Sequence, residues 1–203
     1  MGRGSVAVVV LCANLFILAP LASPQSNALI LPRNLGELVS ESQVVVQGWV
    51  TTVTLTPHPQ LRNLMTVVVT LQVEDTLKGV PEKTFTFQQA VIDRNDQRQK
   101  MGYRAGQHVL LILMKPSPYG LTSPAGMEQG HFRIERSGGG ALAATNGLGN
   151  SGLFRGLASQ LKTRGLSMPP EIQEVMAKPE GGSIPLQPLK DLIRAIAGTG
   201  PTK

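Results

Sequence analysis

The stretch Thr66-Val-Val-Val-Thr-Leu-Gln-Val-Glu74 decides the fold class, because its side chains alternate in character along the chain. Every odd position from Val67 to Val73 is aliphatic, whereas the even positions are polar apart from Val68. An extended chain points successive side chains to opposite faces, so this period of two predicts a strand in a sheet with one solvated face.

Neighbouring segments predict further strands. The run Gln43–Thr54 is largely β-branched and predicts a long strand, with Gly48 marking a bulge or a bend in its middle. Thr84–Gln88 alternates, with both of its phenylalanines on the inward face. His108–Met114 is apolar on both faces, as a central strand would be.

The chain then offers shorter strands around a flexible turn. Leu121–Ser123 is compatible with a short edge strand, and His131–Glu135 alternates again. Gly138-Gly-Gly140 predicts a turn, after which Ala141–Thr145 pairs back as a hairpin.

Helices are predicted at the two ends of this β-rich part. Asn34 and Glu37 predict a capped short helix over residues 35–39. Leucine and phenylalanine recur at helical spacing over residues 153–161, with Ser151 as the N-cap and Gly165 as the stop. Leucine and isoleucine recur at helical spacing over residues 189–196. Residues 166–188 contain five prolines and are predicted to form a linker.

Five or six consecutive strands without crossover helices predict antiparallel pairing. A long bent first strand favours a small closed barrel of the OB type, and a flat sheet capped by the C-terminal helix is the alternative. We therefore expect a mainly β fold, with a barrel domain over residues 29–148 and a helical appendage with a Pro/Gly-rich linker over residues 149–203.

The first 28 residues have the character of a secretory signal peptide. Arg3 precedes an apolar run of about a dozen residues, too short for a membrane span of roughly 20 residues, and Ser26-Asn-Ala28 supplies small residues for cleavage. Large Leu11 before Cys12 disfavours a lipoprotein anchor. We expect an exported protein, in the periplasm or the medium, that begins at Leu29 and has no transmembrane span in its mature part.

Composition excludes several classes of function for the mature chain. Cys12 is the only cysteine, so its removal excludes disulfides and zinc sites built on thiolates. The formal net charge of +6 falls to +5 without Arg3, and no run of basic residues is present. With one Trp, two Tyr and five Phe, the sequence does not predict nucleic-acid binding.

Four segments together resemble a family of exported bacterial proteins of unknown function. The family shows a helix leading into a Val-rich strand, a strand ending in VLKG, a GxxVLLFL strand and a GKFRV strand. This chain has a comparable lead-in over residues 35–48, followed by Thr76-Leu-Lys-Gly79, Gly106-Gln-His-Val-Leu-Leu-Ile-Leu113 and Gly130-His-Phe-Arg-Ile134. The resemblance covers residues 35–155 and implies an OB-like barrel similar to netrin-like and metalloproteinase-inhibitor domains. The inhibitory mechanism is not implied, because it needs an N-terminal cysteine.

No arrangement of residues predicts catalysis, a metal or a cofactor. Gly147–Gly152 matches the dinucleotide fingerprint by letter, but a proline-rich segment follows where a second strand is needed. His58, His108 and His131 show no ligand spacing and are expected to be structural or surface residues. Asp93 and Asp96 lie among basic residues, which favours solvated ion pairs over a general acid and base.

The candidate site is the polar segment 89–107, predicted as a long loop on a rigid barrel. We expect it to bind an unknown protein, an anionic cell-envelope polymer or a carbohydrate, and a disordered insertion is the alternative. The leading prediction is a non-enzymatic exported binding module. A protease inhibitor acting through loops and a hydrolase with a cryptic site are the alternatives. The residues proposed for binding are Arg94, Arg98, Lys100, Tyr103 and Arg104.

Overall fold

The computed structural model describes residues 31–176 and 181–198. The predicted signal peptide lies outside the described residues. From Leu31 onward the chain belongs to one compact unit.

Strands and helices occur in the following order along the chain. They are α1 (Leu35–Glu41), β1 (Ser42–Pro57), β2 (Met65–Lys78), β3 (Thr84–Ala90), α2 (Arg94–Gln99), the 3₁₀ turn η1 (Lys100–Gly102), β4 (His108–Met114), the 3₁₀ turn η2 (Met127–Gln129), β5 (His131–Arg136), β6 (Leu142–Asn146), α3 (Leu157–Thr163), α4 (Pro170–Met176), β7 (Ile184–Pro185) and α5 (Leu186–Ala197).

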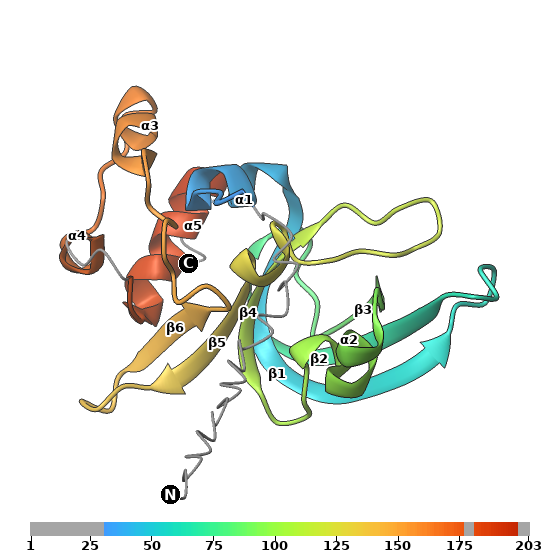
Figure 1. The fold of residues 1–203 in the computed structure, drawn as a ribbon. Helices are drawn as coiled ribbons and strands as arrows, with labels where there is room; N and C mark the ends of the chain where they lie inside the picture. Colours follow the sequence, from blue (N-terminus) through green and yellow to red (C-terminus); the bar gives the residue numbers. More distant parts are fainter. Residues whose placement is uncertain (1–30, 177–180, 199–203) are drawn as a thin grey trace, which may run out of the picture. The chain divides into compact units, whose positions relative to one another are not determined.

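The seven strands form one antiparallel sheet in the order β3-β2-β1-β4-β5-β6-β7 (Figure 1). The predicted mainly β class and antiparallel pairing are therefore confirmed. The sheet is open in the described residues, so closure into a barrel of five or six strands is not confirmed. The reason is that β5, β6 and β7 continue the sheet beyond β4 instead of returning to β3.

The segment after β4 nevertheless bridges the gap between β3 and β4. The backbone N–H of Thr122 donates to Gln88 of β3 at 2.8 Å, and that of Met114 donates to Ser123 at 3.0 Å. The edge strand predicted over Leu121–Ser123 is thus present only as isolated bridges. These bonds curl β1–β4 around an interior without completing a strand ladder.

Two hydrophobic cores lie on opposite faces of the sheet. The first core packs β4, β5 and β6 against α1, α3, α4 and α5, and the second core fills the interior enclosed by β1–β4. Leu110 and Ile112 of β4 belong to the first core, whereas Leu111 and Leu113 belong to the second. The prediction that His108–Met114 is a central strand buried on both faces is confirmed.

The alternation of aliphatic and polar side chains in β2 places one face of this strand against the second core. Val67, Val69 and Leu71 are almost fully buried in the second core, and the side chains between them face outward. In β3, Phe87 enters the same core and Phe85 packs against it. The inward direction predicted for both phenylalanines is confirmed.

The predicted cap of α1 is present in full. Glu37 N–H donates to the Asn34 side chain, and Asn34 N–H donates to the Glu37 carboxylate, both at 3.0 Å. At the other end, Lys78 Nζ donates to the carbonyls of Val39 and Ser42, both at 2.6 Å. The lysine thus ties the last turn of α1 to β2.

Gly48 of β1 lies opposite a bulge whose extra residue is in β2, whereas the sequence predicted a bulge or a bend in the strand that contains Gly48. The register with β2 shifts between Gln47 and Gly48, so that Gln47 pairs with Asp75 and Gly48 pairs with Val73. A Cβ at Gly48 would lie 2.2 Å from the Gln72 carbonyl oxygen, which explains why glycine is needed there. The bulge leaves Glu74 without a partner in the β1–β2 register.

The helix predicted over residues 189–196 is confirmed as α5, whereas α2, α3 and α4 differ from the sequence predictions. The predicted loop 89–107 contains α2 and η1, and the predicted linker 166–188 contains α4, β7 and the start of α5. Helix α3 begins after Gly156 instead of at Ser151, because Gly152 and Gly156 have positive φ angles of 72° and 68° that interrupt a helix.

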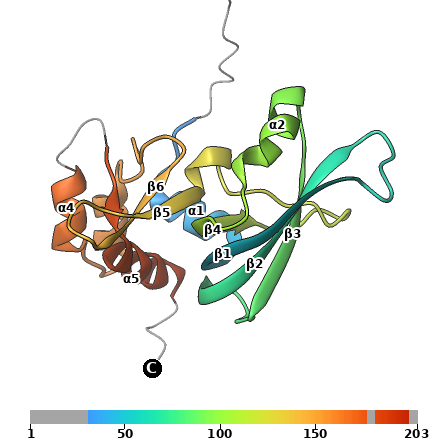
Figure 2. The same ribbon diagram turned by 90° about the horizontal axis from the view of Figure 1, so that it is seen from below.

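Helices α3, α4 and α5 complete the first core together with the strands. Figure 2 shows α4 and α5 beside β5 and β6, while no helix covers β1, β2 and β3 in that view from below. Described residues on both sides of position 148 contribute to the first core, and the boundary predicted there stays a prediction.

Candidate functional site

The predicted binding segment is an ordered helix and turn between β3 and β4. Asp93 caps α2, because its carboxylate accepts hydrogen bonds from the backbone N–H groups of Asn95 at 2.7 Å and Asp96 at 2.8 Å. Burial, and then the negative charge of Asp93, raise the pKa of the Asp96 carboxyl above its usual value. Asp93 is thus a helix cap rather than the solvated ion-pair partner that the sequence suggested.

Tyr103 anchors this segment in the second core. It is 1% exposed, its hydroxyl lies 3.2 Å from Gln89 Oε1, and its ring stacks on His131 with centroids 4.7 Å apart. The Phe87 ring packs edge-on against the Tyr103 ring. Tyr103 therefore positions the segment, and its burial removes it from the set of side chains able to touch a partner.

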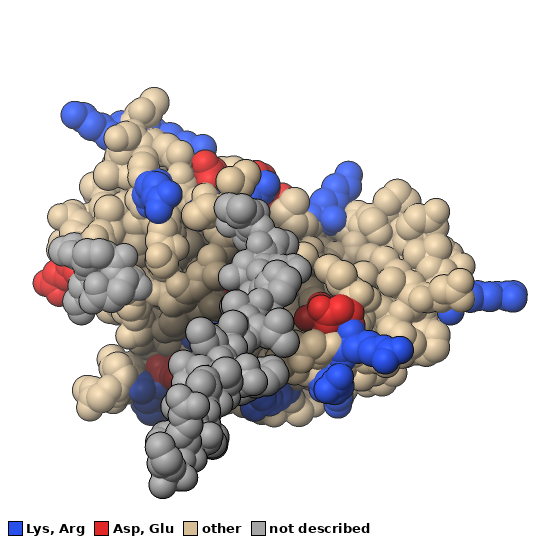
Figure 3. All heavy atoms as spheres, viewed as in Figure 1, with Lys and Arg blue, Asp and Glu red and all other residues tan. Residues whose placement is uncertain are grey.

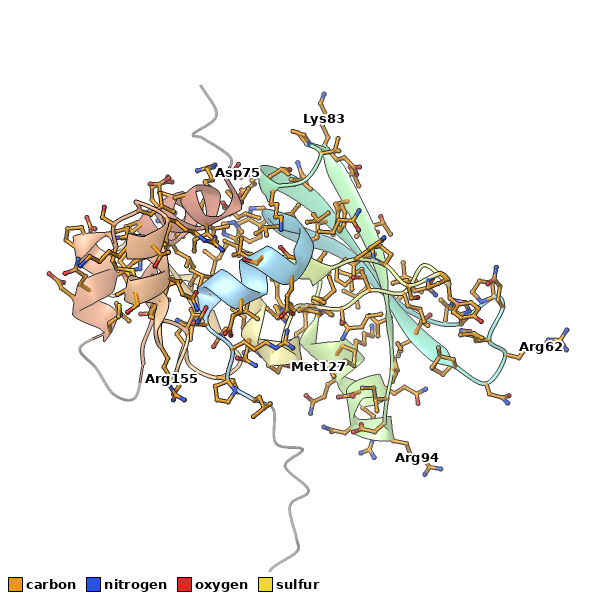
Figure 4. All side chains as sticks on the ribbon, turned by 90° about the horizontal axis from the view of Figure 1, so that it is seen from above. Arg62, Asp75, Lys83, Arg94, Met127 and Arg155 are labelled. Atoms are coloured by element: carbon orange, nitrogen blue, oxygen red, sulfur yellow. The ribbon has the colours of Figure 1, made fainter. Side chains whose placement is uncertain are left out.

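The other four candidates form what we call the basic surface: Arg94, Arg98, Lys100 and Arg104. All four side chains are exposed, and the described part of the chain contains no ion pair with any of them. In Figure 3 basic side chains stand beside acidic ones over the position of α2. Arg94 points away from the body of the protein in Figure 4. The structure thus brings the four cations together on one short, anchored segment.

His131 lies behind this segment and is an unusual buried group. It is 5% exposed, and its Nε2 has no hydrogen-bond partner among the described residues. Burial, helped by the charge of Arg133, lowers its pKa from 6.5 to about 4. The ring is therefore neutral near pH 7 and serves as packing for Tyr103.

A second polar group, which sequence reasoning missed, surrounds Trp49 on β1. The Trp49 ring stacks on His108 with centroids 4.4 Å apart, and its Nε1 donates to Glu74 Oε1 at 2.8 Å. Glu74 Oε2 lies 2.8 Å from His108 Nε2 and accepts from Gln47 Nε2 at 2.7 Å. The only sequence signal was a lone tryptophan in a strand, because the pairing of β1 with β2 and β4 could not be known.

The three histidines lie apart from one another in the fold. His131 pairs with Leu111 and faces the second core, whereas His108 lies on the opposite face of the sheet. His58 is buried, where its Nδ1 accepts from Gln60 and Leu61 and its Nε2 lies 3.1 Å from the Tyr119 carbonyl. Residues 31–176 and 181–198 contain no cluster of three or more potential metal ligands.

The glycine-rich segment Gly147–Gly152 forms turns held by two asparagines. Asn146 and Asn150 exchange backbone-to-side-chain hydrogen bonds of 2.9 and 2.7 Å, and Asn150 Nδ2 also donates to the carbonyls of Ala144 and Gly182. No strand follows α3 before α4 in the described chain, so the context of a dinucleotide fingerprint is missing.

Comparisons with protein-family models, with curated proteins and with solved structures found no match for this chain. Among the described helices, none is long and apolar enough to cross a membrane.

Proposed function

We propose that this protein is an exported, non-enzymatic binding module that holds an anionic cell-envelope polymer on the basic surface. One observation carries the proposal: four exposed cations without ion-pair partners in the described chain lie on a segment that a buried tyrosine fixes in place. An anionic polymer recruited by such a surface gains charge-assisted contacts at several points.

The anchoring of the segment supports binding rather than a disordered insertion. Tyr103 fixes its C-terminal end through Gln89 and His131, and Asp93 fixes its N-terminal end as a helix cap. A surface held in this way loses little conformational entropy when it binds, which leaves more of the interaction energy for affinity.

Export, the resemblance to OB-like exported proteins, and the alternatives of a loop-based protease inhibitor or a hydrolase remain predictions from the sequence. The binding of a polyanion, which is one part of the proposal, depends on the basic surface and not on those predictions. It can therefore be tested with the purified chain from Leu29 onward.

The test is the salt concentration at which the protein elutes from a heparin column, which presents a dense polyanion. Replacing Arg94, Arg98, Lys100 and Arg104 together by Ser should lower that concentration sharply, because each lost contact reduces both affinity and its salt dependence.

The matched control replaces Arg62, Lys83, Arg155 and Lys162 by Ser. These four are also exposed, and the three labelled in Figure 4 lie at separate places on the protein. Both variants lose the same formal charge, so a much larger effect in the basic-surface variant locates the binding there. Equal effects would show that only net charge matters and would contradict the proposal.

A further inference from the structure

The outer face of β1, β2 and β3 carries three cross-strand rows of side chains, which we call the neutral face. The rows run from β1 through β2 to β3 and consist of Trp49–Gln72–Thr84, Thr52–Thr70–Thr86 and Thr54–Val68–Gln88. The alternate rows, such as Val50–Leu71–Phe85, point into the second core. Directly paired residues share a face, so the pairing itself defines this surface.

No member of the neutral face is charged, although most of its side chains are exposed. Threonine is a common strand residue, and this face presents hydroxyl and amide groups without charged side chains among them. The surface therefore favours a ligand that is itself uncharged and rich in hydrogen-bonding groups.

Several of these groups are available to a ligand. The side chains of Thr52, Thr54, Gln72 and Thr84 make no hydrogen bond to any described residue. Thr70 and Thr86 share one bond of 3.1 Å between their hydroxyls, which leaves further donor and acceptor capacity on each.

Trp49 supplies a rigid apolar platform at one end of the neutral face. The residue is 43% exposed, although one side of its ring is covered by His108 and its Nε1 is held by Glu74. The ring is thus fixed before any ligand arrives. Its exposed apolar surface can receive the C–H groups of a ring of similar size.

Glu74 adds a strong acceptor beside this platform. Its side chain is 42% exposed, and its carboxylate is already oriented by Trp49 and Gln47. A carboxylate accepts a stronger hydrogen bond from a hydroxyl group than a neutral oxygen does. Gln47 is 4% exposed, so its amide orients the Glu74 carboxylate and is not itself a contact for a ligand.

We infer that the neutral face binds an uncharged carbohydrate chain, with one sugar ring stacked on Trp49 and neighbouring hydroxyls bonded to the Thr and Gln side chains. A sugar ring has an apolar C–H face and hydroxyls around its edge, which matches a planar indole bordered by hydroxyls, amides and one carboxylate. This site lies on a different part of the fold from the basic surface and does not depend on it.

The sequence contains a single tryptophan, so its fluorescence reports on this site alone. The probes are dextran, galactomannan, xyloglucan and laminarin, each titrated into the protein and each cast separately into native electrophoresis gels. Stacking of a sugar on Trp49 removes water from the indole. We therefore expect at least one polysaccharide to shift the emission to the blue and to retard migration.

Two variants test the assignment, and a third serves as the control. Trp49→Ala should weaken retardation about tenfold or more, the scale seen when an aromatic anchor is truncated. Thr84→Lys places a charge at the β3 end of the Trp49–Gln72–Thr84 row and should also weaken retardation. This second variant keeps the test valid if Trp49→Ala folds poorly. Tyr119→Ala removes another exposed aromatic residue, 53% exposed in the loop after β4, and should bind like the wild type.

Four results would overturn the inference. The first is that none of the four polysaccharides retards the wild-type protein, and the second is that the Trp49→Ala and Thr84→Lys variants bind normally. The other two results would point to a different occupant. A dimer in sedimentation equilibrium that Thr84→Lys dissociates would assign the face to a second copy. Quenching by tetramethylammonium without polysaccharide binding would assign it to an organic cation. In contrast, a basic-surface variant that loses heparin binding but is still retarded by the polysaccharide would support the inference that the two sites are separate.

Discussion

His131 places a titratable ring inside the second core, where its Nε2 finds no partner among the described residues. The ring stacks on Tyr103 and so supports the segment that carries the basic surface. Because burial lowers the pKa of His131 from 6.5 to about 4, the unfolded chain binds this proton more tightly than the folded protein does.

His131 should therefore make stability depend on pH in a defined direction. The contribution of neutral His131 to the free energy of unfolding is full above about pH 6.5. It is lost as the pH falls toward and through the folded pKa of about 4, which lowers the free energy of unfolding by about 3 kcal/mol. His131→Phe keeps a ring against Tyr103 and should reduce this loss. Urea denaturation at pH 7, 5.5 and 4.5 measures it, and an equal loss in both proteins would show that other groups are responsible.

At the scale of elements, an ion cluster joins α5 to β2. Asp75 Oδ2 lies 2.6 Å from Lys190 Nζ and 2.5 Å from Arg194 Nη2, and Figure 4 shows Asp75 beside α5. Burial alone would raise the pKa of Asp75, but its hydrogen bonds to Lys190 and Arg194 outweigh burial and lower the pKa. The contact holds α5 over the end of the sheet.

Replacing Asp75 by Asn removes the charge that faces two cations at a partly buried contact. We expect the free energy of unfolding to fall by about 1.5–3 kcal/mol, the range for hydrogen bonds to charged groups. Asp191→Asn is the control, because that carboxylate is 54% exposed and bonds Arg194 only at the surface. Equal effects in urea denaturation would contradict a structural role for the Asp75 cluster.

The elements that the sequence predicts well are those whose local pattern agrees with their surroundings. The alternation in β2, the doubly apolar β4 and the Asn34–Glu37 capping box all appear as expected. Helix α2 was missed because Asp93 was interpreted as an ion-pair partner instead of a cap. Helix α4 was missed because prolines suggested a linker, although Pro170 stands at the first position of the helix, where proline is tolerated.

The candidate sites could be predicted only in part, for a geometric reason. The four exposed cations of the basic surface are close in sequence, so segment 89–107 could be proposed without a structure. Trp49, Glu74 and His108 come from three strands, and only the pairing register brings them together. Burial of Tyr103 also depends on tertiary packing, so its selection as a ligand contact was mistaken.

At the scale of the whole molecule, β4 couples the two cores, because adjacent residues of this strand enter opposite cores. Helices α3–α5 cover the first core, including Leu110, Ile112 and Phe132. The strands up to β6 thus depend on the C-terminal helices for burial, and we expect the protein to unfold in one cooperative transition.

A chain of residues 29–148 tests this dependence, since it lacks α3, α4, β7 and α5. We expect it to lack a cooperative thermal transition and fixed near-ultraviolet circular dichroism, because one face of β4 would be exposed to water. The longer chain of residues 29–203 is the control. A sharp transition in the fragment would show that the strands form an independent domain.

The most direct test of the binding proposal is an amide chemical-shift map of the folded protein during titration with a heparin hexasaccharide. The account predicts that the largest shifts fall within residues 93–107, around Arg94, Arg98, Lys100 and Arg104, and that they disappear in the basic-surface variant. Shifts centred on Arg62, Lys83 or Arg155, or no saturable shifts at all, would contradict it.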